Sequence, residues 1–79
     1  MILTLMFREY CHLCHQMRAQ LQALQPELKF ELNVVDVDAN PALEALYNEL
    51  VPVLMHEHNQ ICHWHLDESA LRAYLAKLG

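Results

Sequence analysis

The chain begins with an apolar run that leads into a Cys-x-x-Cys motif, and the hydrophobic spacing changes from strand to helix at that point. Residues 2–7 are apolar except for Thr4, which is typical of a strand covered on both faces. From Cys11 onward, apolar residues recur every three or four positions, the period of one helix face. They are Leu13, Met17, Leu21 and Leu24. We therefore predict a strand followed by a helix that ends at Pro26, with the motif at their junction.

The middle of the chain repeats this strand-to-helix pattern. Apolar and polar residues alternate over residues 30–37, which predicts a second strand. Asn40 is a good helix cap and Pro41 suits the first helical position, so a second helix should begin there. Its predicted buried stripe consists of Leu43, Leu46, Tyr47 and Leu50.

The last third of the chain predicts a hairpin and a final helix. Residues 51–55 and 61–65 favour strands, and the polar residues 57–60 between them predict a turn. Asp67 is placed to cap the last helix, and Leu66 with Leu71 matches a hydrophobic staple. The predicted inner face of that helix consists of Leu71, Tyr74, Leu75 and Leu78.

These elements predict a single α/β domain over residues 1–79, in the order β-α-β-α-β-β-α. The first strand-helix-strand unit should be parallel with a right-handed crossover, and the hairpin should be antiparallel. The expected architecture is a four-stranded mixed sheet with helices on both faces.

Composition excludes several classes of protein. The chain has 54% hydrophobic residues, which excludes intrinsic disorder, and its net charge of −5 with only five Lys and Arg argues against nucleic-acid binding. No apolar run is long enough to span a membrane, and no signal peptide is evident, so we expect a cytoplasmic location. Three cysteines do not suggest a structural disulfide framework. We also expect a monomer, since no feature demands an oligomer.

The motif Cys11-His12-Leu13-Cys14 predicts thiol chemistry. A thiol at a helix N-terminus meets unpaired N–H groups and the positive end of the helix dipole, and both favour the thiolate. Cys-x-x-Cys sites of this kind have pKa values of roughly 7 or lower, and the thiolate is the attacking species in disulfide exchange. We therefore predict Cys11 as the nucleophile and Cys14 as the resolving thiol. His12 is a candidate for tuning the site through a hydrogen bond.

The chain resembles a glutaredoxin-like protein of the thioredoxin fold over essentially its whole length. The resemblance rests on residues 8–14 (Arg-Glu-Tyr-Cys-His-Leu-Cys), on Val51-Pro52-Val53, on the hairpin with its terminal helix, and on Cys62-His63-Trp64. It implies a thiol–disulfide oxidoreductase without a tightly bound cofactor, acting on a disulfide-bearing protein or a small-molecule thiol.

The resemblance also implies individual roles around the motif. The Val51–Pro52 bond is expected to be cis, with the Val51 backbone forming an edge that docks substrate. Arg8 matches the basic residue that can meet a glutathione carboxylate, and Asp67 lies near where an acidic group would meet the glutathione amine. Glutathione is therefore a candidate co-substrate. However, residues 63–67 lack the glycine pair that lets the backbone of this family approach glutathione, so a partner-specific redox adaptor is an alternative.

A metal-binding module is the other alternative. A structural zinc site usually needs a second Cys-x-x-Cys motif or a closely spaced pair of His residues in addition to the first Cys pair. The Cys-x-x-Cys motif itself contains neither, and our main interpretation therefore predicts no bound metal. Yet His56, His63 and His65 are expected to share one face of the hairpin, and three imidazoles can bind zinc or copper. Cys62 is expected to be a small buried hydrophobic residue, or else a third redox thiol or a thiol that forms a dimer.

Overall fold

The computed structural model describes residues 1–78, and only Gly79 of the predicted domain lies outside the described residues. The chain forms eight elements in the predicted order, with one short 3-10 helix, η1, added before the second helix. They are β1 (Ile2–Phe7), α1 (His12–Leu28), β2 (Glu31–Asp36), η1 (Val37–Ala39), α2 (Pro41–Tyr47), β3 (Val53–His56), β4 (Asn59–His63) and α3 (Glu68–Leu78).

The four strands form one mixed sheet, as the sequence predicts, and the strands lie in the order β2-β1-β3-β4. β1 pairs in parallel with β2, and both β1–β3 and β3–β4 are antiparallel. β1 is therefore a central strand, and the Cys-x-x-Cys motif follows its carboxyl end directly. None of the helices over residues 1–78 is both long and apolar enough to cross a membrane.

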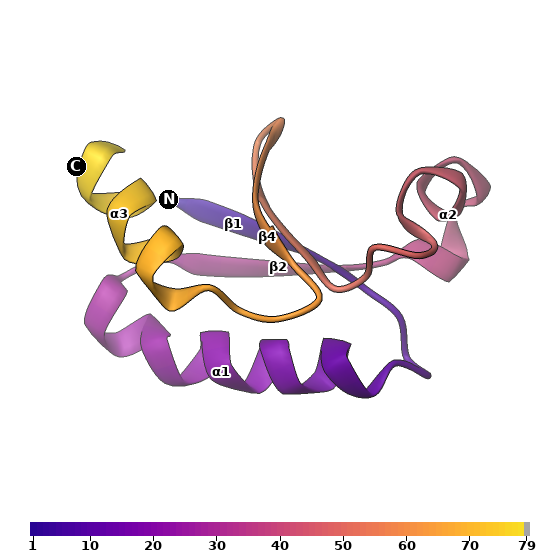
Figure 1. Ribbon diagram of the computed structural model, residues 1–79, viewed down its shortest axis with the longest axis horizontal. Coiled ribbons are helices and arrows are strands. Elements are labelled where there is room, and N and C mark those ends of the chain that lie inside the picture. Colours follow the sequence, from indigo (N-terminus) through magenta and orange to yellow (C-terminus); the bar gives the residue numbers. More distant parts are fainter. Residues whose placement is uncertain (79) are drawn as a thin grey trace.

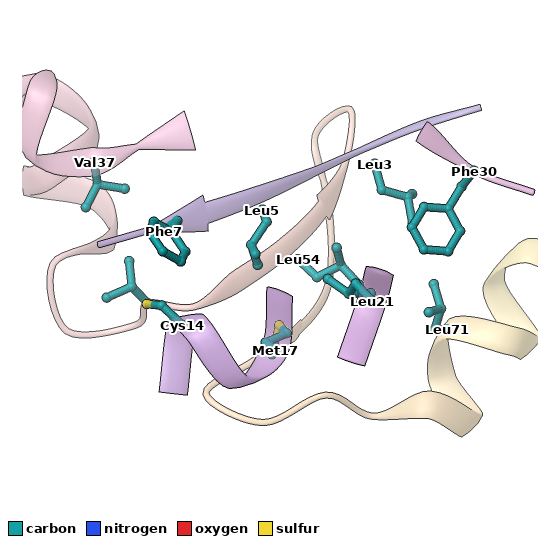
Figure 2. Close-up of a cluster of buried hydrophobic side chains, with 11 residues drawn as sticks. Leu3, Leu5, Phe7, Cys14, Met17, Leu21, Phe30, Val37, Leu54 and Leu71 are labelled. Carbon is teal, nitrogen blue, oxygen red and sulfur yellow. The ribbon is translucent and has the colours of Figure 1, made fainter. Parts of the chain in front are cut away.

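Two helices build the main core on one face of the sheet. Figure 1 shows α1 running along the sheet with α3 near its C-terminal end, while the N-terminal end of α1 carries the motif. Leu3, Leu5 and Phe7 alternate along β1 and are at most 3% exposed. Figure 2 shows them facing α1 and α3. The cluster is completed by Cys14, Met17, Leu21, Phe30, Val37, Val51, Leu54 and Leu71.

The second helix, α2, lies at the far end of the molecule from α3, on the opposite side of the sheet from α1 (Figure 1). Asn40 caps it as predicted, since its Oδ1 accepts the Ala42 N–H at 2.9 Å, and Pro41 occupies the first turn. The predicted buried stripe is wrong, because no residue of α2 is fully buried: Leu43 and Tyr47 are partly buried against the core, and Leu46 is 65% exposed. The helix is too short to carry the stripe further and ends at Tyr47.

The prediction that Pro26 ends α1 is wrong. The helix continues to Leu28, with Pro26 inside its last turns. A proline there costs one backbone hydrogen bond, because its nitrogen has no proton. Leu28 packs against the core, and Lys29 ends the helix in the left-handed conformation with its N–H bonded to the Gln25 carbonyl. Burial and the cap therefore extend the helix beyond the proline.

The hairpin differs from the prediction by a shift of its turn. His56 pairs with Asn59, so only residues 57 and 58 form the turn, and Glu57 takes a positive φ of 55°. The register shifts between Leu54 and Met55 because Ile61 is an extra residue, and β4 ends at His63 rather than at residue 65. In α3, Asp67 is the predicted cap, with Oδ1 accepting the Ala70 N–H, but Leu78 is 47% exposed rather than buried.

Candidate active site

Cys11 is the N-cap residue of α1, at the end of the loop that leaves β1. Its backbone is extended, and its Sγ accepts the Cys14 N–H at 3.1 Å. Its own N–H donates to the Arg8 carbonyl at 3.2 Å, which closes the loop. The sulfur thus takes the position that a Ser or Asp oxygen takes in an ordinary helix cap, and a backbone N–H points at it. This contact stabilises negative charge on the sulfur.

Cys14 lies one helical turn deeper and is fully buried. Figure 2 shows it near Phe7, at the end of the core closest to Val37. Burial, followed by a hydrogen bond with Cys11, raises the pKa of Cys14 to about 12, while a backbone hydrogen bond from Arg8 and the Arg8 charge act in the opposite direction. The two thiols of the motif are therefore unlike: Cys11 is accessible at the surface, and Cys14 holds its proton in the core.

This difference predicts a slow alkylation of Cys14. Only the thiolate form of a cysteine reacts with an alkylating agent. Since the pKa of Cys14 is about 12, which is four pH units above pH 8, only about one Cys14 thiol in 10⁴ is ionised at pH 8. A Cys11→Ser variant loses the contributions of the Cys11 thiol but keeps burial, the largest cause of the raised pKa, so we expect iodoacetamide labelling of Cys14 to stay at least tenfold slower than in urea-unfolded protein at pH 8. The folded rate should rise with pH over the range in which the variant stays folded. Peptide mass mapping measures it, and equal folded and unfolded rates at pH 8 would contradict the burial of the thiol.

The Val51–Pro52 bond is cis, as the resemblance implied. Val51 and Pro52 are buried, and Val51 belongs to the same core cluster as Cys14. The loop before β3 therefore contributes to the same part of the hydrophobic core as the buried Cys14. The Val51 N–H is already bonded to the Tyr47 carbonyl at 3.1 Å, and the docking of substrate on this backbone stays a prediction.

Trp64 is a site residue to which the sequence analysis assigned no role. Its backbone N–H donates to the Pro52 carbonyl, and its indole Nε1 donates to the Glu49 carbonyl, both at 2.9 Å. It does so with a positive φ of 64°, which is unusual for a bulky residue. The loop after β4 is thereby tied to the loop before β3, and the indole remains 48% exposed.

Trp64 also faces the active-site helix. Together with Leu66 it lines a small recess of about 60 Å³ against the first turns of α1, where Leu13 and Gln16 lie. Leu13 belongs to the Cys-x-x-Cys motif, so the recess borders the active-site helix, although neither cysteine lines it. The local sequence gives little indication of this role, because tryptophan rarely adopts the left-handed conformation that Trp64 has here.

Arg8 lies in the loop between β1 and α1, and its guanidinium is bound within the protein. Nε donates to both carboxylate oxygens of Asp38 at 3.0 and 3.2 Å. The terminal nitrogens donate to Asn48, one to Oδ1 at 2.7 Å and one to the backbone carbonyl at 3.4 Å. Arg8 thus joins the active-site loop to η1 and to the end of α2. Its predicted contact with a substrate carboxylate stays a prediction.

Asp67 and Cys62 line a second and larger groove, formed by β4 and the start of α3. The groove has a volume of about 720 Å³, and its lining includes Cys62, His65, Asp67 and Glu68. Asp67 uses Oδ1 to cap α3, so one of its oxygens is occupied. Burial raises the pKa of Cys62, and this thiol is half-buried, in keeping with the prediction of a small core-like residue. The glutathione contact predicted for Asp67 remains a prediction.

Two histidines follow the motif into α1. His12 is the first helical residue and is exposed, so its predicted tuning role remains a prediction. His15 is half-buried and packs edge-on against Phe7. Its Nε2 donates to the Glu9 carbonyl at 2.7 Å and its Nδ1 accepts from Arg18 at 3.2 Å, an arrangement that fits the neutral ring. His15 thus braces the loop before Cys11.

The expectation that three hairpin histidines share one face is wrong. His56 lies on the face of Leu54 and bonds to the Tyr74 hydroxyl of α3 at 2.6 Å. His63 pairs with Val53 and bonds to Gln60 at 2.7 Å, which puts it on the opposite face of the sheet. The extra residue in β4 and the shifted turn cause this difference. Across residues 1–78, no three His, Cys, Asp or Glu side chains are grouped so as to hold a metal ion.

A family model and a curated protein both match nearly the whole chain. The family model described as "Glutaredoxin-like domain (DUF836)" matches residues 2–76. An uncharacterized protein of Mycobacterium tuberculosis is 33% identical over 78 residues, which span 92% of this chain and 80% of that protein.

Solved structures agree on the fold. A solution structure of a protein from Nitrosomonas europaea is 44% identical with a TM-score of 0.80, covering 91% of this chain and 87% of that one. An X-ray structure from X. campestris is 36% identical with a TM-score of 0.71, covering 95% and 96%. Fasciola hepatica thioredoxin, at 24% identity and a TM-score of 0.64 over 96% of this chain and 78% of its own, matches in fold. The chain therefore belongs to the glutaredoxin-like domain family and has the thioredoxin fold.

Proposed function

We propose that this protein is a thiol–disulfide oxidoreductase that reduces disulfides of proteins or small mixed disulfides. The observation that carries the proposal is the pairing of unlike thiols at one helix end. The half-exposed Cys11 sulfur receives the Cys14 N–H at 3.1 Å, and the Cys14 thiol is buried one turn away with a pKa raised to about 12. An attacking thiol and a protected resolving thiol need this difference in access.

The first step is attack by the Cys11 thiolate on one sulfur of the substrate disulfide. A bond forms between Cys11 Sγ and that sulfur, the substrate S–S bond breaks, and the second substrate sulfur leaves as a thiolate that takes a proton from solvent. The N–H of Cys14 lies where it supports negative charge on Cys11 both before attack and when this sulfur later becomes a leaving group. Cys14 does not compete at this stage because it is protonated and buried.

The second step is release by Cys14. Once Cys11 carries the substrate, its sulfur bears no negative charge and accepts hydrogen bonds only weakly. Two of the causes that raise the pKa of Cys14, the hydrogen bond and the charge of Cys11, are then removed. As Cys14 attacks Cys11 Sγ, its proton passes through solvent to the departing substrate sulfur, the S–S bond between Cys11 and the substrate breaks, and the substrate leaves as a thiol. The substrate disulfide has gained two electrons, and a Cys11–Cys14 disulfide has formed.

A thiol reductant completes the cycle by returning two electrons to this disulfide, and glutathione is our candidate for it. The lack of a glycine pair in residues 63–67 and the exposed Trp64 support a protein substrate at least as well as a glutathione adduct. A dedicated protein partner therefore remains within the proposal.

The proposal is tested by turnover. We expect the protein, supplied with excess dithiol reductant, to accelerate reduction of insulin disulfides or of a glutathione mixed disulfide at least tenfold over the reductant alone. A Cys62→Ser variant is the matched control and should keep this activity, since the mechanism does not use Cys62. Rates equal to the reductant alone with both substrates would refute the proposed function.

A further inference from the structure

The Arg8 guanidinium is the cation closest in sequence to the nucleophile, and an acidic side chain occupies it. Nε donates to both oxygens of Asp38, and each terminal nitrogen gives one N–H to Asn48. Of the five N–H donors of an arginine, only one on each terminal nitrogen is left. An incoming carboxylate therefore meets an arginine whose charge is paired and which keeps only two of its five N–H donors.

The charge of Arg8 nevertheless reaches the dithiol. The Arg8 backbone carbonyl accepts the Cys11 N–H at 3.2 Å, which fixes Arg8 in the loop beside the nucleophile, and the Arg8 side chain is only 23% exposed, which limits screening of its charge by water. Its positive charge counts among the effects that lower the pKa of Cys14. Pairing with Asp38 thus determines how much positive potential an approaching disulfide meets near Cys11.

The other cations offer little replacement. Lys29 follows the far end of α1, and Arg72 and Lys77 belong to α3 (Figure 1). Arg18 lies over the Phe7 ring at 4.7 Å and also bonds to His15. The acidic Glu9 lies beside Arg8 and is exposed. With Asp38 in place, the loop before Cys11 offers an anionic substrate no unpaired cation of its own.

We propose that Asp38 is a specificity-determining residue that, by pairing with Arg8, makes the site discriminate against anionic disulfides in favour of uncharged or cationic ones. This inference rests on the proposed function, since it concerns which disulfide Cys11 attacks. Asp38 lies 30 residues from Arg8 in the sequence and brings a negative charge to the loop through η1. The substrate class it favours is a protein disulfide flanked by neutral or basic residues.

The test is a charge series of small disulfides in single turnover. Pre-reduced protein with the Cys62→Ser background reacts with cystamine, 2-hydroxyethyl disulfide and dithiodipropionate, which are cationic, neutral and anionic. Each rate constant is divided by that of free cysteine with the same disulfide. For the unmodified Asp38 site, we expect the order cationic, neutral, anionic. An anionic disulfide that reacts fastest would overturn the inference, and this arm needs no Asp38 variant.

The Asp38→Asn variant then gives the direct comparison, because its amide oxygen still accepts from Nε while the charge is removed. We expect about a tenfold gain for dithiodipropionate, which corresponds to roughly 1.4 kcal/mol, with the neutral disulfide changed less than twofold. The gain should shrink in 0.5 M salt and disappear in an Asp38→Asn, Arg8→Gln double variant. Glu44→Gln, which removes an exposed charge from α2, is the matched control.

Two results would overturn the inference: an equal effect of Asp38→Asn on all three disulfides, or an equal gain from Glu44→Gln. If the unmodified site reacts with none of the three faster than free cysteine does, the proposed function fails instead. The two failures are therefore distinct.

Discussion

Replacing Cys11 by serine will abolish turnover, with a loss of about a thousandfold or more, the scale expected when an enzyme loses its nucleophile. The reason is that Cys14 cannot take over. Its thiol is fully buried, and its pKa is raised to about 12 chiefly by that burial, which the substitution leaves in place. A serine hydroxyl at the cap still accepts the Cys14 N–H, so the helix should keep its N-terminal cap.

The measurement is the initial rate of disulfide reduction under the conditions used for the unmodified protein. Circular dichroism and thermal unfolding of the variant serve as controls for folding. Cys62→Ser, measured in parallel, should retain the rate. A Cys11→Ser variant that still reduces disulfides within tenfold of the unmodified protein would show that another thiol performs the attack.

Replacing Cys14 by serine should have the second largest effect, an accumulation of mixed disulfide. Cys11 keeps its position and its contact with the backbone N–H of residue 14, which does not depend on the side chain there. Attack therefore proceeds, but the intramolecular release step is lost. With a protein disulfide as substrate, we expect a covalent complex that approaches one substrate per protein, against a barely populated one in the unmodified protein.

Non-reducing electrophoresis and peptide mass mapping measure this complex, and the substrate should be attached to Cys11. Activity on a glutathione mixed disulfide should survive in part, because a second glutathione can release the first in place of Cys14. Attachment to Cys62 or the absence of any complex would contradict the assigned roles. An additional Cys62→Ser substitution removes the remaining thiol and should leave the trapped fraction unchanged.

Much of the fold and the central pair of thiols follows from local chemistry, which is why sequence predicts it. The capping residues Asn40 and Asp67 accept hydrogen bonds from amides two to three positions away, so a short stretch of sequence is enough to predict their roles. Cys11 is predictable for the same reason, since its sulfur accepts the N–H of Cys14. Helix and strand order follows from apolar spacing in the same way.

The features that sequence reasoning missed depend on contacts between distant segments. Arg8 finds its partners 30 and 40 positions away, and Trp64 finds its partner at Glu49. The prediction that His56, His63 and His65 share one face of the hairpin was wrong. One extra residue in β4 and a two-residue turn without glycine changed the register between β3 and β4. The helix-ending preference of Pro26 was outweighed by the burial of Leu28 and by the cap that Lys29 provides. In each case, tertiary packing outweighed a local preference.

The central claim is that Cys11 and Cys14 form one reversible redox couple. It is tested most directly by equilibrating the protein with mixtures of reduced and oxidised glutathione, trapping free thiols, and mapping each cysteine by mass. We predict a single two-electron transition in which Cys11 and Cys14 lose their thiols together as a mutual disulfide while Cys62 remains labelled throughout. If Cys11 and Cys14 titrate independently, or if either pairs with Cys62 instead, the account is contradicted.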